Sequence, residues 1–247
     1  MKSLISSLYI SVLFTSQVFP QFNYLPAEIP GHQVVAYTQF TLSYNETHEQ
    51  ADWVAYELDK TEAQMETDRC NCFKKDNNIL FGSATPEDYT NTGFDKGHLS
   101  PSEDNQLSPE NNRESFLMSN MSPQLHRFNG GIWKELEEWV REKAIEFDTI
   151  YVVSGPVFIN SLGSIGTNEV TIPGYFYKVI LRFENGSPKT IAFFIPQVNA
   201  IGQLKVKDYI VPVNALETLT GIDFFPALDN SIENVVESRD NSTQWGF

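Results

Sequence analysis

The sequence predicts an α+β domain, because segments of strand-like composition lie on both sides of one long amphipathic helix. From residue 130 to about residue 147, apolar side chains recur at intervals of three and four, as one face of a helix requires. Residues 149–158, 175–183 and 189–196 are rich in β-branched and aromatic side chains. We therefore expect a central antiparallel sheet flanked by helices.

The remaining elements follow from turn and capping signals. Residues 34–44 and 53–58 also have strand character, and the NETHEQ segment between them predicts a turn, so these two strands should pair. The ENGSP segment predicts a hairpin turn between residues 175–183 and 189–196. A second helix is expected over residues 214–220, with Asn214 as its N-cap and Gly221 ending it.

The length of 247 residues, without a Pro/Gly/Ser-rich linker, indicates a single domain. Lys2 precedes an apolar stretch over residues 4–14, which predicts a signal peptide over residues 1–21 and a domain over residues 22–247. A buried N-terminal strand or helix is the alternative for this stretch. No later segment is apolar enough to span a bilayer, so we expect a soluble protein that is secreted or periplasmic.

The charge balance is acidic, with 17 basic and 32 acidic residues and a net charge of −15. This is the wrong sign for a protein that holds nucleic acid on a broad basic surface. A few Arg and Lys side chains around a metal ion can nevertheless suffice for an enzyme, because the ion supplies positive charge. The composition therefore disfavours passive nucleic-acid binding and leaves a nuclease open.

The two cysteines, Cys70 and Cys72, are separated by one residue. This spacing matches neither a CxxC redox motif nor half of a zinc site. A tight disulfide, a bond between chains and two free thiols all remain open.

The segment Asp95-Lys96-Gly97-His98 places an acid, a base, a glycine and an imidazole in consecutive positions. His98 could act as a base near neutral pH, or it could be an ordinary histidine satisfied by one hydrogen bond. Further motif residues follow at spaced positions, namely Asn120, Pro123, Gln124, Asn129, Trp133, Leu136 and Glu137. Together these blocks resemble the DNA/RNA non-specific endonuclease family, which includes mitochondrial endonuclease G and secreted bacterial nucleases. A weaker resemblance covers residues 37–226.

The resemblance implies a ββα-metal nuclease fold in which His98 ends a strand and faces the start of the long helix. By resemblance, His98 is the general base and Asn129 is the protein ligand of Mg²⁺, with Mn²⁺ or another divalent ion as alternatives. Glu137 would hold metal-bound water, and Arg141 would stabilise the transition state. Phosphodiester hydrolysis needs such a base and such positive charge. Without the resemblance, Asn129 could be an N-cap, Glu137 an exposed charge, and Arg141 its i,i+4 partner.

Four further residues receive roles from the resemblance. Arg69 would contact substrate, with a plain surface charge as the alternative, and Asn120 would orient His98 or water at the metal, with a turn residue as the alternative. Asp95 would fix the loop or the imidazole instead of binding the ion. Lys96 would bind substrate where the family motif has Arg, and it keeps the charge but lacks the planar fork that grips a phosphate.

The sequence thus predicts an exported endonuclease that cuts DNA, RNA or both without strong sequence specificity. Two alternatives are a metal-dependent phosphodiesterase acting on a small nucleotide and a nucleic-acid-binding homologue that has lost catalysis. A closed pocket would favour the small substrate, whereas an open cleft lined with Arg and Lys would favour a polymer. The choice between a monomer and a homodimer is left open.

Overall fold

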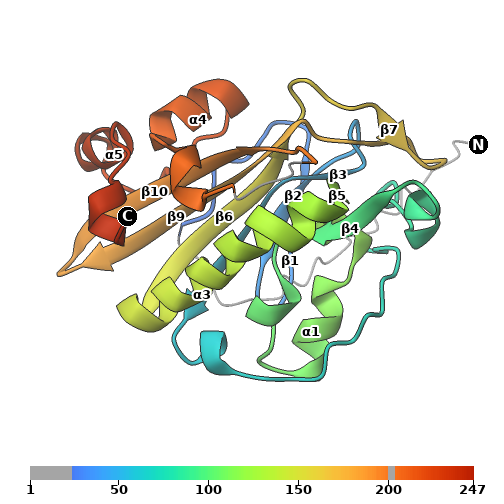
Figure 1. Ribbon diagram of the computed structural model, residues 1–247, viewed down its shortest axis with the longest axis horizontal. Helices are drawn as coiled ribbons and strands as arrows, with labels where there is room; N and C mark the ends of the chain where they lie inside the picture. The colour runs from blue at the N-terminus through green and yellow to red at the C-terminus, as the bar shows by residue number, and fades with distance from the viewer. Residues whose placement is uncertain (1–23, 200–203) are drawn as a thin grey trace, which may run out of the picture.

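The computed structural model describes residues 24–199 and 204–247, so the predicted signal peptide lies outside the described residues. Its centre is a seven-stranded sheet in the order β1-β2-β3-β6-β9-β10-β11, in which every pairing is antiparallel. Helix α3 covers one face of this sheet, and α4 and α5 cover the other (Figure 1). The strands of the sheet are β1 Gln33–Ala36, β2 Thr41–Asn45, β3 Gln50–Asp59, β6 Thr149–Val157, β9 Tyr175–Glu184, β10 Ser187–Pro196 and β11 Ile210–Val211.

Both faces of the central strands are apolar, because both are covered. In β3, Tyr56 and Leu58 belong to the core beneath α3, whereas Trp53 and Ala55 belong to the core beneath α4. Alternate residues of a strand point to opposite faces, so this split follows directly from the two-residue period. The same alternation places Lys178 of β9 on the α3 side of the sheet, between Phe176 and Ile180 of that core.

The predicted strand over residues 34–44 is wrong as a single element. It forms two strands, β1 and β2, which pair with each other around a turn closed by a 2.7 Å hydrogen bond from the Tyr37 nitrogen to the Phe40 oxygen. The predicted pairing with the next strand is confirmed for β2 and β3. The hairpin turn between β9 and β10 is also confirmed, with φ of 49° at Asn185 and 78° at Gly186, as a tight two-residue turn requires.

The helices are α1 Pro109–Ser115, α2 His126–Phe128, α3 Lys134–Phe147, α4 Val213–Thr220 and α5 Asn230–Glu237. The long helix was expected from residue 130, but Asn129–Trp133 forms a π-helical turn, η5, with a non-helical Gly131 (φ −112°, ψ −116°). The N-cap of α4 is Pro212, so the prediction of Asn214 in that role is wrong. Gly221 ends this helix as predicted, in the left-handed conformation at φ 73°.

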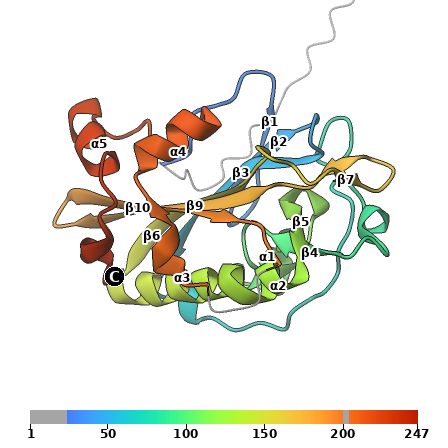
Figure 2. The ribbon, with the colours of Figure 1, turned by 45° about the horizontal axis from the view of Figure 1, so that its top comes forward.

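A two-stranded ribbon, β4 Phe94–His98 and β5 Met121–Leu125, leads into α2 and lies on the same side of the sheet as α3 (Figure 2). The chain just after β4 is fastened to the sheet, since the Ser154 hydroxyl donates to the Leu99 carbonyl at 2.9 Å. A small core joins this ribbon to the short strands β7 Ser164–Ile165 and β8 Val170–Thr171. The ribbon and the start of α3 are therefore held together against one sheet.

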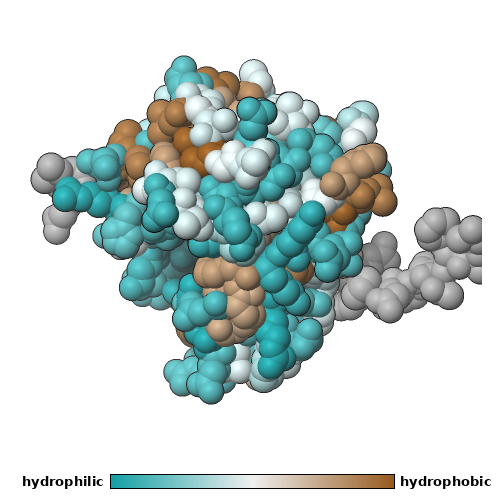
Figure 3. All heavy atoms as spheres, turned by 90° about the vertical axis from the view of Figure 1, so that its right-hand side faces the viewer, coloured by the Kyte–Doolittle hydropathy of each residue, from teal (hydrophilic) through white to brown (hydrophobic). Residues whose placement is uncertain are grey.

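The surface on the side of β7 is mostly hydrophilic, with separate hydrophobic patches (Figure 3). Among the residues described, no helix has the length and hydropathy needed to cross a membrane. Cys70 and Cys72 form an intrachain disulfide with a Cα–Cα distance of 5.1 Å, which selects the first of the three states open from the sequence.

Candidate active site

His98 lies at the last position of β4, next to the start of the long helix. Its side chain is only 8% exposed and meets the ring of Phe116 edge-on at 4.8 Å. The indole nitrogen of Trp133 donates to the His98 carbonyl at 3.3 Å, which ties the strand end to the helix. The expected placement of His98 is thus confirmed, and two regular elements hold it.

The environment of His98 keeps its imidazole neutral. Burial, followed by the positive charge of Arg69, lowers the pKa of His98 to about 3. Its Nε2 atom is buried and has no hydrogen-bond partner among the described residues. The neutral form with one uncommitted nitrogen is the form that a proton acceptor requires, whereas the lowered pKa by itself makes the ring a weaker base.

Asn129 is fastened to the strand that carries His98. Its amide nitrogen donates to Asp95 Oδ2 at 3.0 Å, and the same carboxylate oxygen lies 3.0 Å from Nδ1 of His126. Because the nitrogen faces Asp95, the amide oxygen of Asn129 is directed away from it. The backbone of Asn129 is already helical (φ −58°, ψ −54°), so the alternative of an N-cap is wrong. Asp95 fixes Asn129 and not the ring of His98, which corrects one of its two expected roles.

Glu137 and Arg141 lie about two and three helical turns after Asn129. They do not form an ion pair with each other. Arg141 Nη1 binds Asp104 Oδ1 at 3.0 Å, and the hydroxyl of Tyr56 donates to the other oxygen of Asp104 at 2.8 Å. The alternative of an i,i+4 pair between Glu137 and Arg141 is therefore wrong. The acid that Arg141 binds is fully buried and comes from η3 Ser102–Asp104.

Lys178 completes this group from the sheet below. It is 0% exposed, its ammonium donates to the Ser154 hydroxyl at 3.3 Å, and it lies 4.7 Å from the centre of the Trp133 ring. Two acids, Glu137 and Asp104, thus face two bases, Lys178 and Arg141. Burial raises the pKa of Glu137 to about 8 although Lys178 opposes this, and burial lowers the pKa of Lys178. Glu137 is half-buried, so it is not the exposed charge of the alternative interpretation.

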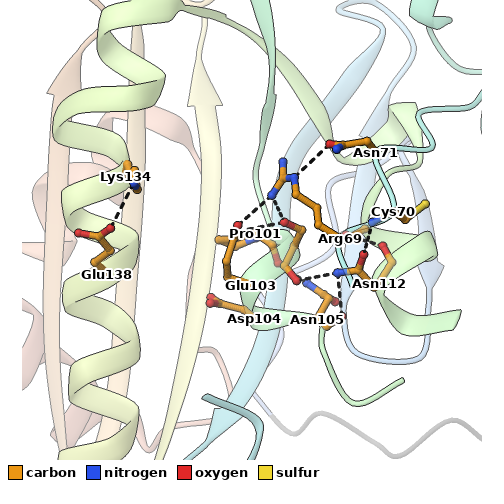
Figure 4. Close-up of polar contacts among 12 residues, drawn as sticks. Arg69, Cys70, Asn71, Pro101, Glu103, Asp104, Asn105, Asn112, Lys134 and Glu138 are labelled. Carbon is orange, nitrogen blue, oxygen red and sulfur yellow. Dashed lines mark hydrogen bonds and ion pairs between the residues drawn. The ribbon is translucent and has the colours of Figure 1, made fainter. Parts of the chain in front are cut away.

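Arg69 lies near enough to His98 for its charge to lower the pKa of the imidazole, and Figure 4 shows its guanidinium directed at Glu103 and Asn71. Its Nη1 binds the Ser102 hydroxyl and, at 2.8 Å, Glu103 Oε1. The guanidinium also lies 5.1 Å from the centre of the Phe116 ring, whose edge-on contact with His98 brings the two basic groups together. The side chain of Arg69 remains 42% exposed, so an incoming anion can reach it.

Lys96 is near this group without joining it. Its ammonium lies 5.2 Å from the ring centre of Phe73 and 5.7 Å from that of Tyr89, as expected for a cation over aromatic faces. The side chain is half-buried. Phe73 lies in turn beside the ring of His98 at 5.8 Å between centres, so Lys96 borders the site.

Asn120 acts on the backbone that follows His98. Its side-chain oxygen accepts from the Ser100 nitrogen at 2.9 Å, and its nitrogen donates to the carbonyls of Ser100 and Ser115 at 2.9 and 2.8 Å. Asn120 is fully buried, and these bonds occupy its amide. Asn120 therefore holds the backbone that follows His98, and its part in the reaction stays a prediction.

The donor atoms present fit a hard divalent ion held mainly by water. Within residues 24–199 and 204–247, no three His, Cys, Asp or Glu side chains converge on a common metal position. Asn129 and Glu137 instead offer an amide oxygen and a carboxylate on the same helical segment. Mg²⁺ keeps several waters and needs few protein ligands, so this donor set fits it.

Three residues around this site escaped the sequence analysis: Glu103, Asp104 and Lys178. Glu103 and Asp104 gave no signal, because their partners lie more than thirty residues away in the chain. Lys178 did leave a signal, since it is a charge within the apolar YFYKVILRF strand at a position that faces the core.

A β-ribbon ending in histidine, packed on an antiparallel sheet and followed by a helix with this Asn, Glu and Arg order, defines a ββα-metal nuclease fold. The family described as DNA/RNA non-specific endonuclease matches residues 20–231, and the chain belongs to this family. The predicted family and fold class are thereby confirmed.

Known nucleases are similar to this chain over most of its length. The mitochondrial nuclease EXOG of Xenopus laevis is 35% identical over 217 residues, covering 81% of this chain and 60% of that protein. A nuclease of Nostoc sp. is 31% identical over 221 residues, covering 85% of this chain and 79% of that protein. A crystal structure of the EndoG/EndoGI complex matches with a TM-score of 0.75 at 27% identity, covering 81% of this chain and 88% of that one. The chain spans about 60% of the length of the EXOG relatives.

Proposed function

We propose that the protein is an exported, metal-dependent endonuclease that hydrolyses phosphodiester bonds of DNA, RNA or both. The observation that carries this proposal is the 3.0 Å bond between Asp95 and Asn129, which fixes an amide oxygen beside the strand that ends in His98. A base and a metal-ligating oxygen are thereby held on joined elements. Family membership supports the same reaction.

His98 is the general base in this proposal. Its Nε2 takes a proton from the attacking water, whose oxygen forms the new bond to phosphorus while the bond from phosphorus to the 3′ oxygen breaks. A bound divalent ion supplies positive charge for the phosphoryl oxygens and for the leaving group. Asn129 would hold that ion through its amide oxygen, and Glu137 would hold water around it through its carboxylate.

The two arginines stabilise the extra negative charge of the transition state. Arg141 is directed by Asp104, so its guanidinium is fixed before the substrate arrives. Arg69 exchanges Glu103, its partner in the free protein, for a phosphate, because the two side chains are 42% and 45% exposed and their bond is only weakly protected from water. Charge-assisted bonds from guanidinium to phosphate suit this task.

A polymer is favoured over a small nucleotide as the substrate. Arg69 is 42% exposed, and Lys96 and Arg141 are half-buried, so basic side chains of this site are within reach of a ligand from solvent. Phosphates on either side of the cut bond can meet such groups, whereas a mononucleotide has no further phosphodiesters to place there. The surface as a whole is acidic, which disfavours a catalytically inactive nucleic-acid-binding protein.

Export is part of the proposal because of the signal-peptide pattern over residues 1–21. The EXOG and endonuclease G relatives are named as mitochondrial proteins, so the destination of this chain needs its own test. Cell fractionation with N-terminal sequencing should find the mature protein outside the cytoplasm, beginning near residue 22. An unprocessed protein that stays with the cytoplasm or an organelle would contradict export.

The nuclease proposal is tested by incubating the purified protein with closed circular DNA and with circular single-stranded RNA, in Mg²⁺ and in EDTA. Circular substrates have no ends, so only an endonuclease can linearise them. We expect cleavage that needs the metal and is lost in His98→Gln. His48→Gln is the matched control, because His48 stacks on Phe158 and binds Thr171 away from the β4 ribbon. A folded wild type that cuts neither circle with any divalent ion would overturn the proposal.

A further inference from the structure

A cavity of about 450 Å³ lies between α4 and α5, on the face of the sheet opposite α3. Four carboxylates border it, from Glu217 on α4, Asp223 just after that helix, and Glu233 and Glu237 on α5. Neutral polar side chains such as Asn214 and Asn234 complete the wall. None of its described lining residues is Lys, Arg or His, so the carboxylates face one another without a cation.

Glu237 forms the inner wall of this cavity. Its side chain is 1% exposed, and its Oε1 atom is buried with no hydrogen-bond partner in the described part of the chain. The carbonyl of Val236, next to it, accepts bonds from Thr190 at 2.8 Å and Asn241 at 2.6 Å, which hold this end of α5 in place. These bonds fix the backbone beside Glu237.

An acid in this position destabilises the folded protein unless something neutralises it. Burial, followed by the negative charges of Glu217, Glu233 and Asp223, raises the pKa of Glu237 to about 9. A carboxylate that is buried, unpaired and surrounded by other acids is costly to ionise. A bound cation would offset the repulsion between these carboxylates and would supply the hydrogen-bond donor that Glu237 lacks.

We propose that this cavity binds a small organic cation with two or more primary ammonium groups, of the polyamine class. No three of the described carboxylates converge on one metal position, and the volume of the cavity is much larger than that of a single ion. An ammonium group has three donors and no acceptor, which complements a wall made of acceptors. Ile222 and Gly221 in the lining offer an apolar surface for the methylene chain between the charges.

The cavity is separate from the nuclease site, which lies on the α3 side of the sheet (Figure 2). A ligand in this cavity would therefore bind without touching a nucleic acid held at the nuclease site. Because the net charge is −15, any polycation is also attracted weakly to the whole surface. The test must separate the cavity from that general attraction.

The experiment is calorimetric titration of spermidine into the full chain without nucleic acid, in about 0.15 M salt, where charges beyond about 8 Å are screened. We expect saturable binding at one site per chain, weakened at least about tenfold in Glu237→Gln and in Glu233→Gln. The matched control is Glu142→Gln on α3, an exposed acid on the other face of the sheet, which should bind as the wild type does. Wild-type binding should also release protons, seen as a dependence of the heat on buffer ionisation, and Glu237→Gln should lose this dependence.

Three outcomes would overturn the proposal. The first is spermidine binding to the wild type that does not saturate. The second is a loss of spermidine affinity in Glu142→Gln as large as that in Glu237→Gln. The third is tight binding of Ca²⁺ alone at the same carboxylates. The last outcome would make the cavity a site for a metal ion.

Discussion

Replacing Lys178 with Met tests whether the buried charges beneath Glu137 act as a balanced group. Lys178 is 0% exposed and lies with Arg141 among the two acids Glu137 and Asp104. Methionine keeps most of the volume but leaves two carboxylates with one guanidinium. Removing one partner of a buried ion pair costs about 3–5 kcal/mol, and we expect the free energy of unfolding to fall by about that amount in urea denaturation.

The same substitution should raise the metal requirement of cleavage. Burial raises the pKa of Glu137 and the positive charge of Lys178 opposes this rise, so Lys178 helps to keep the Glu137 carboxylate ionised, and a falling pH protonates it. Because only the carboxylate can hold water around the ion, the Mg²⁺ concentration for half-maximal cleavage should rise about tenfold per pH unit below the pKa of Glu137. Lys178→Met removes a charge that lowers this pKa, so the rise should begin at a higher pH.

The double variant Lys178→Met/Glu137→Gln separates charge balance from packing. It again pairs one acid with one base, so it should recover a large part of the lost stability without recovering activity. The matched control is Lys134→Met on α3, where the Lys is 63% exposed and pairs with Glu138 at 3.5 Å, and it should change stability by less than about 0.5 kcal/mol. A cost at Lys178 as small as that of the control, or a double variant as unstable as the sum of the singles, would refute the reasoning.

Three further predictions concern the site. Asp95→Ala releases the amide of Asn129, so the Mg²⁺ concentration for half-maximal cleavage should rise about 10–100-fold with a similar maximal rate; an unchanged requirement in a metal titration would exclude this role. Lys96→Arg restores a planar fork beside Phe73 and Tyr89 and should lower the KM for plasmid about two- to fivefold, as steady-state kinetics can show. Because the pKa of His98 is lowered to about 3, its contribution to stability is full above about pH 6.5 and is lost as the pH falls toward 3. Acid unfolding of His98→Gln should therefore be shallower than that of the wild type, and identical pH profiles would contradict the buried, neutral imidazole.

The strands of the sheet were predictable where burial on both faces produced a continuous run of apolar residues. The strands that became β6, β9 and β10 are continuous apolar runs, which is what a sheet covered on both faces requires. The turn at Tyr37 to Phe40 was hidden because its aromatic side chains stack on each other at 4.6 Å and have the composition of a strand. The π-helical turn at Gly131 was hidden as well, since Ile132 and Trp133 keep the apolar spacing of a helix across it.

The placement of the candidate residues His98 and Asn129 on neighbouring elements was predictable from the spaced motif, but the hydrogen-bond partners of the candidate arginines were not. His98 and Asn129 lie on elements that the ribbon β4–β5 and the bond to Asp95 join, as the motif implied. The partners of Arg69 and Arg141 come from η3, a short turn whose sequence has no pattern tied to either arginine. Pairings of this kind depend on how distant segments pack, and no local pattern in the sequence predicts that packing.

The measurement that tests the central claim most directly is the rate of plasmid cleavage as a function of Mg²⁺ concentration, for the wild type, Asn129→Ala and His98→Gln. If Asn129 holds the ion and His98 accepts the proton, Asn129→Ala will need at least about tenfold more Mg²⁺. His98→Gln will keep the wild-type metal requirement and lose at least about a hundredfold in maximal rate. Equal effects of the two substitutions on the metal requirement, or full activity in either variant at the wild-type Mg²⁺ concentration, would contradict the account.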